Sequence, residues 1–448
     1  TASNLIDVQS AIVSASTNTL ELFSNGDIDV NALIQVGGAL QLIADGSADG
    51  TSGIINIAAN IDAETIQFTS KGLTGSGAIT VNSELDIAGV SNAIEYAGTA
   101  TGASPAASLI TGTSNNTFAL TGSQTQFTID GATFDGFASV DADSAGTLTG
   151  TADIDNFVLA GADSVKINGT TFNKIATVDG SDGDDDVQSE LANWKIQAEN
   201  TTRLDGIDFS GIESVNKYIS AGVTDRSITG TDSQDAFSII DENTIKVNGI
   251  TYYGIGNVYA GNNTDTVTGL TGQAWTIYRD GNTFDGFSGS GVTFKDTEVA
   301  DSLSSGSLTG TDLSERFATK GSLNQVIFGF GNVTFNGITR VDAKKGNQWV
   351  YNSGDRLYTN NNETESFKVV GNDIVGNGIT FIDFERMEGE AVDTFSAIGS
   401  SKTYVLEFND VDNKYGFVSE IEVGTISIAT NDYTQISDTS VVSFQGLS

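Results

Sequence analysis

Several residue types that usually carry protein chemistry are missing from this sequence. Its 448 residues include no cysteine and no histidine. Disulfide bonds, zinc sites built on Cys or His, and histidine-based catalysis are therefore excluded. A chain without thiols also forms no wrong disulfides while it crosses an oxidising compartment unfolded, so this absence fits export from the cell.

Positive charge is scarce as well. The sequence has 20 Lys and Arg against 58 Asp and Glu, a formal net charge of −38. This charge would repel a phosphate backbone and an anionic membrane surface, so we expect no nucleic-acid partner. No run of about eighteen apolar residues occurs, so we expect no membrane insertion. Divalent cations, neutral glycans and basic partners are compatible with such a chain.

Proline occurs once, at Pro105, whereas glycine occurs 52 times. Collagen and proline-rich linkers are therefore excluded. Apolar residues make up 38 % of the chain and are spread evenly along it. This distribution favours many thin core layers over one thick core.

Short runs of alternating apolar and polar residues fill the first hundred positions. Gly, Asn, Asp and Ser separate them, which is the pattern of strands and turns. Equivalent strands begin at spacings of 20, 26 and 19 residues, at Leu20 (LELF), Leu40 (LQLI), Ile66 (IQFT) and Leu85 (LDIA). A repeat of about twenty residues with two or three short strands is expected for one turn of a β-solenoid.

From about residue 105 a second repeat system takes over. One of its elements is T-G-T-x-x-x-x-x-F, and its last three copies are spaced by 80 residues. The copies are TGTSNNTF (111–118, one residue short), TGTADIDNF (149–157), TGTDSQDAF (229–237) and TGTDLSERF (309–317).

The other element is [DN]-G-x-x-[FY]-x-x-[IF]-x-x-[VM]. Five copies match it closely: DGATFDGFASV (130–140), NGTTFNKIATV (168–178), DGIDFSGIESV (205–215), NGITYYGIGNV (248–258) and NGITFIDFERM (377–387). Two looser copies are DGNTFDGFSGS (280–290) and GNVTFNGITRV (331–341).

Each copy of this element has a physical interpretation. The Asn/Asp-Gly pair predicts a tight turn with positive φ. The apolar residues at positions 5, 8 and 11 are expected to face the core from different sides of a bend. We expect the aromatic residues at position 5 to be core residues rather than ligand contacts. We also expect them to stack on one another as a ladder of Phe134, Phe172, Phe209 and Tyr252.

An acidic stretch, VDGSDGDDDV (178–187), interrupts this pattern. Within it, GSDGDDDVQ (180–188) matches the calcium nonapeptide G-G-x-G-x-D-x-U-x except at Ser181. In a calcium array the carboxylates act together with carbonyls of an adjacent turn. The candidate calcium ligands are Asp182, Asp184, Asp185 and Asp186.

A solvated acidic turn without a ligand is the favoured alternative. Calcium arrays need tandem copies nine residues apart, and ELANWKIQ (190–197) provides none. The corresponding places further along are AGNNTDTVT (260–268) and AKKGNQWVY (343–351), which match Asp185 with Asp265 and then Gln348. The stretch therefore reads as the most acidic variant of a recurring turn. No cofactor is required, and calcium is the one that the sequence suggests.

Three tryptophans lie close to these turns, at Trp194, Trp275 and Trp349. Their rings could stack on the apolar face of a sugar. The favoured alternative is that they fill the interior where the coils are wide.

Two stretches of the N-terminal part resemble the coils of filamentous-haemagglutinin-type adhesins, NGDIDVNALIQVGGALQLIADG (25–46) and IINIAANIDAETIQFTSKGLTGSGAITVNSELDIAG (54–89). Those adhesins are secreted by the two-partner route, through a dedicated outer-membrane pore. The second repeat resembles units of giant bacterial surface and biofilm-matrix adhesins, in which segments similar to IDFSGIESV (207–215) or TFIDFERMEGEAVDTF (380–395) close a repeat. The resemblance implies a right-handed parallel β-helix, an adhesive or matrix role, the secretion pore as a partner, and no catalytic residues.

We therefore expect an all-β chain that folds as a right-handed parallel β-helix (β-solenoid) rod with irregular coils. Its predicted parts are coils of about twenty residues (1–104), degenerate 40/80-residue repeats (105–400), and further coils or a cap (401–448). The chain begins within the strand pattern, at TASNLIDVQS, and is expected to be a processed protein or a segment of a longer rod.

The expected function is that of a secreted adhesin or biofilm-matrix scaffold at the bacterial cell surface. Its expected ligand is an exopolysaccharide or another cell-surface glycan, bound passively by weak repeated contacts. Two alternatives are open: a passive stalk or self-assembling fibre or sheath subunit, and a β-helical polysaccharide lyase or hydrolase. Catalysis is disfavoured because the arginines are spread between 203 and 386 without an obvious cluster.

Overall fold

The computed structural model describes most of the chain up to residue 342 and separate strands beyond it. The described residues are 5–44, 53–90, 94–112, 117–123, 125–190, 193–218, 226–280, 283–311, 316–319, 324–328, 333–342, 356–359, 366–370, 373–376, 378–382, 386–389, 394–398, 403–409, 414–420 and 442–444. Of the two later copies of the acidic turn, the structure describes 260–268 but not 343–351.

The described residues form strands and turns, with 65 % in strands and none in helices. The predicted all-β class is confirmed. A search of these residues for a helix long and apolar enough to cross a membrane found none. The chain divides into two compact units: unit 1 comprises Thr1–Ala192 and Gln197–Ser220, and unit 2 comprises Asn193–Ile196 and Ala221–Ser448.

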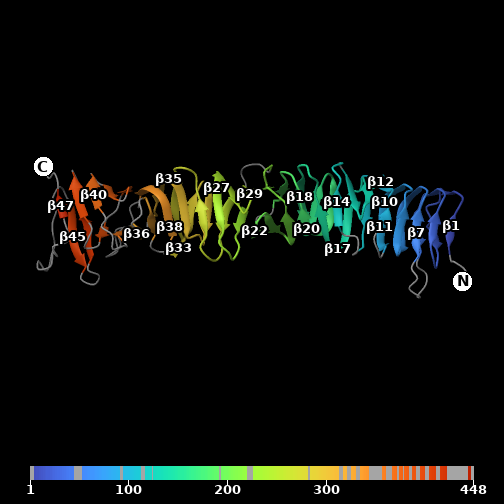
Figure 1. Ribbon diagram of the computed structural model, residues 1–448, viewed down its shortest axis with the longest axis horizontal. Coiled ribbons are helices and arrows are strands. Elements are labelled where there is room, and N and C mark those ends of the chain that lie inside the picture. The colour runs from blue at the N-terminus through green and yellow to red at the C-terminus, as the bar shows by residue number, and fades with distance from the viewer. Residues whose placement is uncertain are drawn as a thin grey trace. The chain divides into compact units, whose positions relative to one another are not determined.

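The strands of unit 1 range from 2 to 12 residues in length and lie side by side, drawn from blue to green in Figure 1. They are β1 (Ile6–Val8), β2 (Ile12–Ser14), β3 (Leu20–Phe23), β4 (Ile28–Val30), β5 (Ile34–Val36), β6 (Ala39–Ile43), β7 (Ile54–Ile57), β8 (Ile61–Ser70), β9 (Gly72–Gly75), β10 (Ile79–Val90), β11 (Ile94–Tyr96), β12 (Thr99–Gly102), β13 (Ser108–Ile110), β14 (Thr117–Leu120), β15 (Gln126–Ile129), β16 (Ala132–Asp135), β17 (Ser139–Thr149), β18 (Asn156–Gly161), β19 (Ser164–Ile167), β20 (Thr170–Asp179), β21 (Asp186–Gln188), β23 (Thr201–Leu204), β24 (Ile207–Ser210) and β25 (Ser214–Val215).

Unit 2 begins with the first part of β22 (Asn193–Ala198). Its other strands are β26 (Arg226–Thr229), β27 (Ala236–Asp241), β28 (Thr244–Val247), β29 (Ile250–Tyr253), β30 (Ile255–Tyr259), β31 (Thr266–Thr268), β32 (Ala274–Asp280), β33 (Thr283–Gly289), β34 (Val292–Lys295), β35 (Val299–Thr309), β36 (Arg316–Thr319), β37 (Val326–Phe328), β38 (Val333–Asp342), β39 (Arg356–Thr359), β40 (Ser366–Val370), β41 (Asp373–Gly376), β42 (Ile379–Ile382), β43 (Arg386–Gly389), β44 (Thr394–Ile398), β45 (Thr403–Asn409), β46 (Lys414–Glu420) and β47 (Val442–Phe444). The predicted last part, 401–448, is described only over β45, β46 and β47.

Parallel pairing between successive circuits of the chain organises unit 1. The first sheet has the strand order β1-β4-β7-β9-β11, all parallel. Ile6 pairs with Ile28, and Ile28 pairs with Ile55, so one circuit takes 22 residues and the next takes 27. We call one such circuit a coil. Two longer strands each take part in two further parallel pairings. One end of β8 pairs with β5 and its other end with β6, and one end of β10 pairs with β12 and its other end with β13.

The predicted strand equivalence in the first hundred residues is confirmed at the level of single residues. Leu20 pairs with Leu40, Leu40 with Ile66, and Ile66 with Leu85. Leu40, Ile66 and Leu85 are buried. Burial of one such side chain stabilises the fold by roughly 1.5–3 kcal/mol, so an apolar residue at this position of every coil forms a continuous strip of core.

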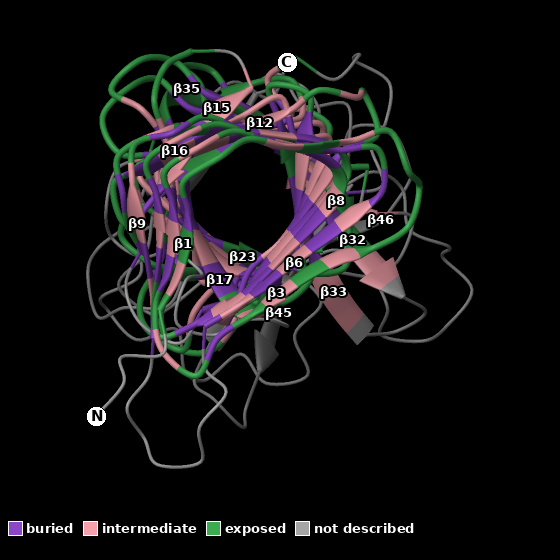
Figure 2. Ribbon diagram, turned by 90° about the vertical axis from the view of Figure 1, so that its right-hand side faces the viewer, coloured by how far each residue is buried: buried purple, intermediate pink, exposed green. Residues whose placement is uncertain are grey.

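Burial follows the two-residue period of a strand. Figure 2 shows buried positions alternating with partly exposed ones along many strands, with exposed residues concentrated in the turns. Successive side chains of a strand point to opposite faces, so alternate apolar residues are sufficient to line the interior. The thin, repeated core expected from the even spread of apolar residues follows from this arrangement.

Antiparallel hairpins are added to the parallel ladders from β14 onward, within the predicted second repeat. Four of these hairpins, β15–β16, β19–β20, β23–β24 and β28–β29, turn at predicted Asn/Asp-Gly pairs. Asn168 and Gly169 have φ values of 51° and 91°, and Asn248 and Gly249 have 48° and 89°. Two consecutive residues with positive φ form the type I′ turn that matches the twist of a hairpin, so this prediction is confirmed.

The aromatic residues at position 5 are core residues, but their predicted ladder is wrong. Phe172 pairs with Val140 of the preceding copy, and Phe209 pairs with Val178. All of these side chains are buried. Each aromatic residue therefore lies beside the position-11 valine of the preceding copy, because the bend at position 8 moves the chain to the next ladder before the coil closes.

One of the two looser copies is also assigned differently. Val258 pairs with Phe294, not with Phe284, so the copy that follows β30 is SGVTFKDTEVA (290–300) rather than 280–290. Ser290 and Gly291 have φ values of 48° and 81° and replace the Asn/Asp-Gly turn. The sequence pattern required Asn or Asp at the turn, so it did not match this copy, which has serine there. The other looser copy is confirmed, because Phe335 pairs with Ala300.

The turn geometry predicts different effects for two glycines. Replacing Gly169 with Ala should lower the free energy of unfolding by about 1 kcal/mol, because the turn holds it at φ 91°. Replacing Gly72 with Ala should raise that free energy by about 0.5 kcal/mol, since an added Cβ meets nothing within 4 Å there and strand φ suits alanine. Urea unfolding of both variants measures the difference, and equal effects would contradict the turn assignment.

Candidate functional site

The four candidate calcium ligands separate into two exposed and two buried side chains. Asp182 and Asp184 are exposed in the turn between β20 and β21, whereas Asp185 and Asp186 are fully buried. A solvated acidic turn describes the first pair only. Asp185 and Asp186 are consecutive residues at the point where the chain enters β21. Consecutive side chains of a strand point to opposite faces, so these two are buried on opposite faces.

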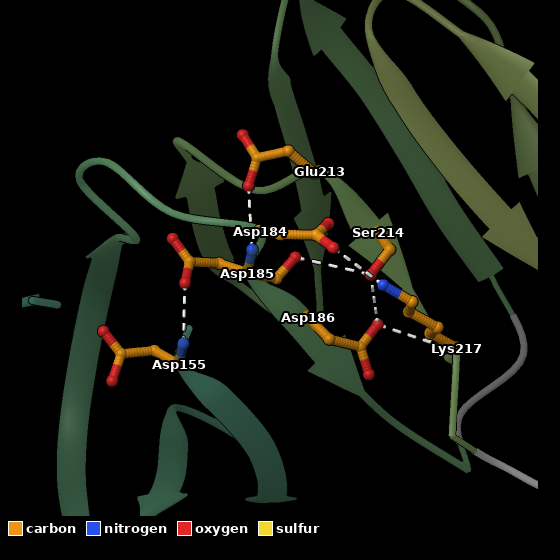
Figure 3. A network of polar contacts seen from close by, with 7 residues as sticks. All are labelled: Asp155, Asp184, Asp185, Asp186, Glu213, Ser214 and Lys217. Carbon is orange, nitrogen blue, oxygen red and sulfur yellow. Dashed lines mark hydrogen bonds and ion pairs between the residues drawn. The ribbon is translucent and has the colours of Figure 1, made fainter. Parts of the chain in front are cut away.

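Asp185 belongs to a column of acids in unit 1 that connects three coils (Figure 3). The backbone N–H of Asp155 donates to Asp185 Oδ1 at 2.7 Å. The backbone N–H of Asp185 donates in turn to Glu213 Oε2 at 2.8 Å. We call Asp155, Asp185 and Glu213 the first carboxylate column.

Unit 2 contains a second carboxylate column, formed by Asp235, Asp265 and Glu298. The backbone N–H of Asp235 donates to Asp265 Oδ1 at 2.7 Å, and that of Asp265 donates to Glu298 Oε2 at 2.7 Å. The predicted equivalence of Asp185 and Asp265 is therefore matched by the same hydrogen bonds in both units. The aspartates recur at a spacing of 80 residues and the glutamates at 85, so the same hydrogen bonds form in each copy of the repeat.

The position of each acid explains its role. Every member of a column directly precedes a strand of a parallel ladder, for example Asp155 before β18 and Asp185 before β21. At this corner the backbone N–H of each aspartate donates to the carboxylate of the next coil, whereas the N–H of each glutamate donates to the carbonyl oxygen of the central aspartate. Charge-assisted bonds of this kind are stronger than neutral ones, and a buried N–H left unpaired costs about 1–3 kcal/mol.

Asp186 and Asp184 are directed away from the column (Figure 3). Asp186 Oδ1 accepts hydrogen bonds from Ser214 Oγ at 2.9 Å and from the backbone N–H of Lys217 at 3.1 Å. Asp184 forms an ion pair with Lys217 Nζ at 2.9 Å. The described part of the chain contains no group of three or more acidic side chains arranged to hold a metal. Contacts within the protein account for Asp184 and for Oδ1 of Asp186, whereas the buried Oδ2 of Asp186 has no hydrogen-bond partner among the described residues. Calcium binding stays a prediction.

Burial gives the central acid of each column an unusual proton affinity. It raises the pKa of Asp185 to about 6, and the nearby charges of Asp155, Glu213 and Asp184 act in the same direction. Burial likewise raises the pKa of Asp265 to about 6. The Oδ2 atoms of both residues have no hydrogen-bond partner among the described residues. A proton on Oδ2 would remove a buried charge while Oδ1 kept its bond.

Sequence reasoning missed four members of the two columns: Asp155, Glu213, Asp235 and Glu298. A signal for them was present. TGTADIDNF (149–157) and TGTDSQDAF (229–237) share Asp at position 7, and DGIDFSGIESV (205–215) and SGVTFKDTEVA (290–300) share Glu at position 9. A polar residue kept at one position of a degenerate repeat indicates a bond to the neighbouring coil.

The two tryptophans that the structure describes do not offer a sugar-binding surface. Trp194 and Trp275 are fully buried, which excludes sugar stacking at both and confirms that they fill the interior. Trp275 Nε1 donates a hydrogen bond to Ser302 Oγ at 2.7 Å. Trp349 lies outside the described residues.

No protein-family model matches this sequence, and neither a curated protein nor a solved structure is significantly similar to it.

The raised pKa values predict how stability depends on pH. Between about pH 4 and pH 6 the folded chain holds protons on Asp185 and Asp265 that the unfolded chain has released. The free energy of unfolding should therefore fall as pH rises through this window. D185N/D265N keeps an acceptor at Oδ1 and cannot ionise, so its urea-unfolding midpoint should change less between pH 4 and pH 7 than that of the wild type.

Two further variants serve as controls. D182N removes an exposed charge and should keep the pH dependence of the wild type. D185A leaves the N–H of Asp155 unpaired and should destabilise unit 1 by about 1–3 kcal/mol. An unchanged pH profile in the double variant would contradict the assignment of the raised pKa values to these two residues.

Proposed function

We propose that this chain is a right-handed β-solenoid that acts as a secreted or cell-surface bacterial adhesin or biofilm-matrix scaffold. The observation that carries the proposal is the coil-to-coil register, in which equivalent residues such as Leu20, Leu40 and Ile66 pair in parallel. A fold built from nearest-neighbour stacking grows in length without needing a larger core. Length and rigidity are the properties that such a scaffold supplies.

The proposed mechanism is passive. The rod holds weak binding positions away from the cell, and their contacts add by avidity. The proposal assigns no reaction to the chain, because the buried acids of the carboxylate columns hold backbone N–H groups rather than facing a substrate.

Export through an outer-membrane two-partner secretion pore fits the same architecture. Each coil of a solenoid stacks on the coil before it, so folding proceeds as the chain emerges. A chain without cysteine needs no disulfide formation outside the cell. The net charge of −38 opposes self-association during passage.

The proposed ligand is an exopolysaccharide or another cell-surface glycan, with calcium as an optional contributor at the acidic turn. The test is binding of the purified chain to a panel of bacterial exopolysaccharides, in calcium and again in chelator. Saturable binding to at least one glycan is the expected result. Loss of that binding in chelator, and in a D182N/D184N variant, would assign calcium to the turn.

Absence of binding to every glycan, with the chain folded and monomeric, would contradict the adhesin proposal and leave a passive stalk. Concentration-dependent assembly without glycan binding would identify a fibre or sheath subunit instead. Release of oligosaccharides from any member of the panel would contradict the non-catalytic proposal. Size-exclusion chromatography with light scattering, and chromatography of the soluble products, separate these outcomes.

A further inference from the structure

Four neighbouring strands of unit 2 carry a row that includes two exposed tyrosines and a lysine. Lys295 on β34 pairs with Tyr259 on β30, and Tyr278 on β32 pairs with Gly286 on β33. β33 and β34 pair through Phe287 and Phe294, which are the chain neighbours of Gly286 and Lys295. The row is therefore Tyr278, Gly286, Lys295 and Tyr259, on four neighbouring strands.

The side chains of this row point outward. Tyr278 and Tyr259 are 51 % and 38 % exposed, while their strand neighbours Ile277 and Val258 are buried. The Nζ of Lys295 lies 5.6 Å from the centre of the Tyr259 ring. The pKa of Lys295 is raised, mainly by its hydrogen bond to Asp285 and to a lesser extent by the nearby Tyr259 and Tyr278. Three strand spacings of about 4.8 Å separate the backbones of the two tyrosines by about 14 Å.

Gly286 adds no side chain to the middle of the row, and its own backbone is buried. A Cβ at this position would lie 2.1 Å from the carbonyl oxygen of Phe294, so no side chain fits between Tyr278 and Lys295. Asp285, the neighbouring residue in β33, forms an ion pair with Lys295 at 2.8 Å. The row consequently offers two aromatic rings with a donor and an acceptor of opposite charge between them.

A second row runs beside the first and is uncharged. Thr276 pairs with Ser288, Ser288 with Thr293, and Thr293 with Asn257. All four residues are partly or fully exposed. Hydroxyl and amide groups that both donate and accept hydrogen bonds thus border the aromatic row.

The corresponding row of unit 1 provides an internal comparison. Asp179 pairs with Ser210, as Tyr259 pairs with Lys295, and Ser210 pairs with Thr201 on the hairpin strand. These three residues of unit 1, Asp179, Ser210 and Thr201, include no aromatic ring and no cation. The fold therefore does not need tyrosine or lysine at these positions, so packing does not explain their presence in unit 2.

We propose that the face formed by Tyr259, Tyr278, Asp285 and Lys295 binds a neutral, linear glycan laid across strands β30, β34, β33 and β32. The inference rests on the proposed function and names the surface and the ligand class. The tyrosine rings receive the apolar faces of two sugar units, as amphipathic aromatic side chains do at wet interfaces. The Asp285–Lys295 pair and the bordering hydroxyls bond the sugar hydroxyls between them.

Charge favours a neutral glycan over an acidic one. The charges of Lys295 and Asp285 cancel locally, so the face offers no unpaired cation from this pair to a uronate or sulfate. The chain as a whole has a net charge of −38 and repels a polyanion before contact. An uncharged chain of sugar rings meets neither obstacle.

The test uses the full chain and four neutral probes, namely cellohexaose, maltohexaose, xylohexaose and mannohexaose, together with an alginate hexamer as the acidic probe. Isothermal titration calorimetry measures the dissociation constants. We expect at least one neutral hexasaccharide to bind, and Y278A and Y259A each to weaken it about tenfold. Y278F, which keeps the ring, should retain binding within about threefold.

Tyr218 supplies the matched control. It is 57 % exposed and lies against Lys217, but it is in unit 1, on a turn rather than in a sheet row. Y218A should leave the dissociation constants unchanged. Because all three tyrosines are exposed, urea-unfolding midpoints of the variants should match that of the wild type, which shows that a binding loss is local.

Three outcomes would overturn the inference: no neutral hexasaccharide binds, only the alginate hexamer binds, or Y259A/Y278A binds as the wild type does. The exopolysaccharide panel, repeated with Y259A/Y278A, separates this inference from the proposed function. Retained polysaccharide binding in that variant would reject this face and keep the adhesin. Failure of the wild type to bind any polysaccharide would reject both.

Discussion

Backbone hydrogen bonding from each coil to the next is the constraint on which the rest of this structure depends. Every coil must leave its polar groups in register with the coils on either side, since each buried N–H that lacks a partner is costly. In straight strands the parallel ladder meets this requirement. At the corners, where the chain bends between ladders, side chains must supply the missing acceptors, and the carboxylate columns do so in both units.

Using acids at these corners has an electrostatic consequence. A carboxylate is a strong acceptor, but stacking acids one coil apart places like charges near one another in a buried position. The central acid of each column responds with a raised pKa, and its second oxygen lies without a partner among the described residues. The same groups that hold the coils in register therefore make the free energy of unfolding fall as pH rises through the mildly acidic range.

The sequence was informative where a residue's role depends on its own neighbours in the chain. The alternation around Leu20, Leu40 and Ile66 predicted the coil spacing, and Asn168–Gly169 predicted a positive-φ turn. Roles that depend on the neighbouring coil were not predictable in the same way. Phe172 was expected beside Phe134 but lies beside Val140. The sequence does not distinguish the two arrangements, because both bury the same residues. The hydrogen bond that Glu213 accepts and the pairing of Tyr259 with Lys295 both follow from how neighbouring coils are aligned.

The offset between Phe and Val has a consequence for how the series of repeats begins. Phe172 and Val178 belong to one copy, yet Phe172 stacks on the preceding copy and Phe209 of the following copy stacks on Val178. Each copy is therefore offset by one ladder relative to the copy before it. A series of such copies does not complete itself, because its first aromatic residue needs a partner from outside the series. Ala100 is that partner for Phe134, so the start of the series depends on the coil that precedes it.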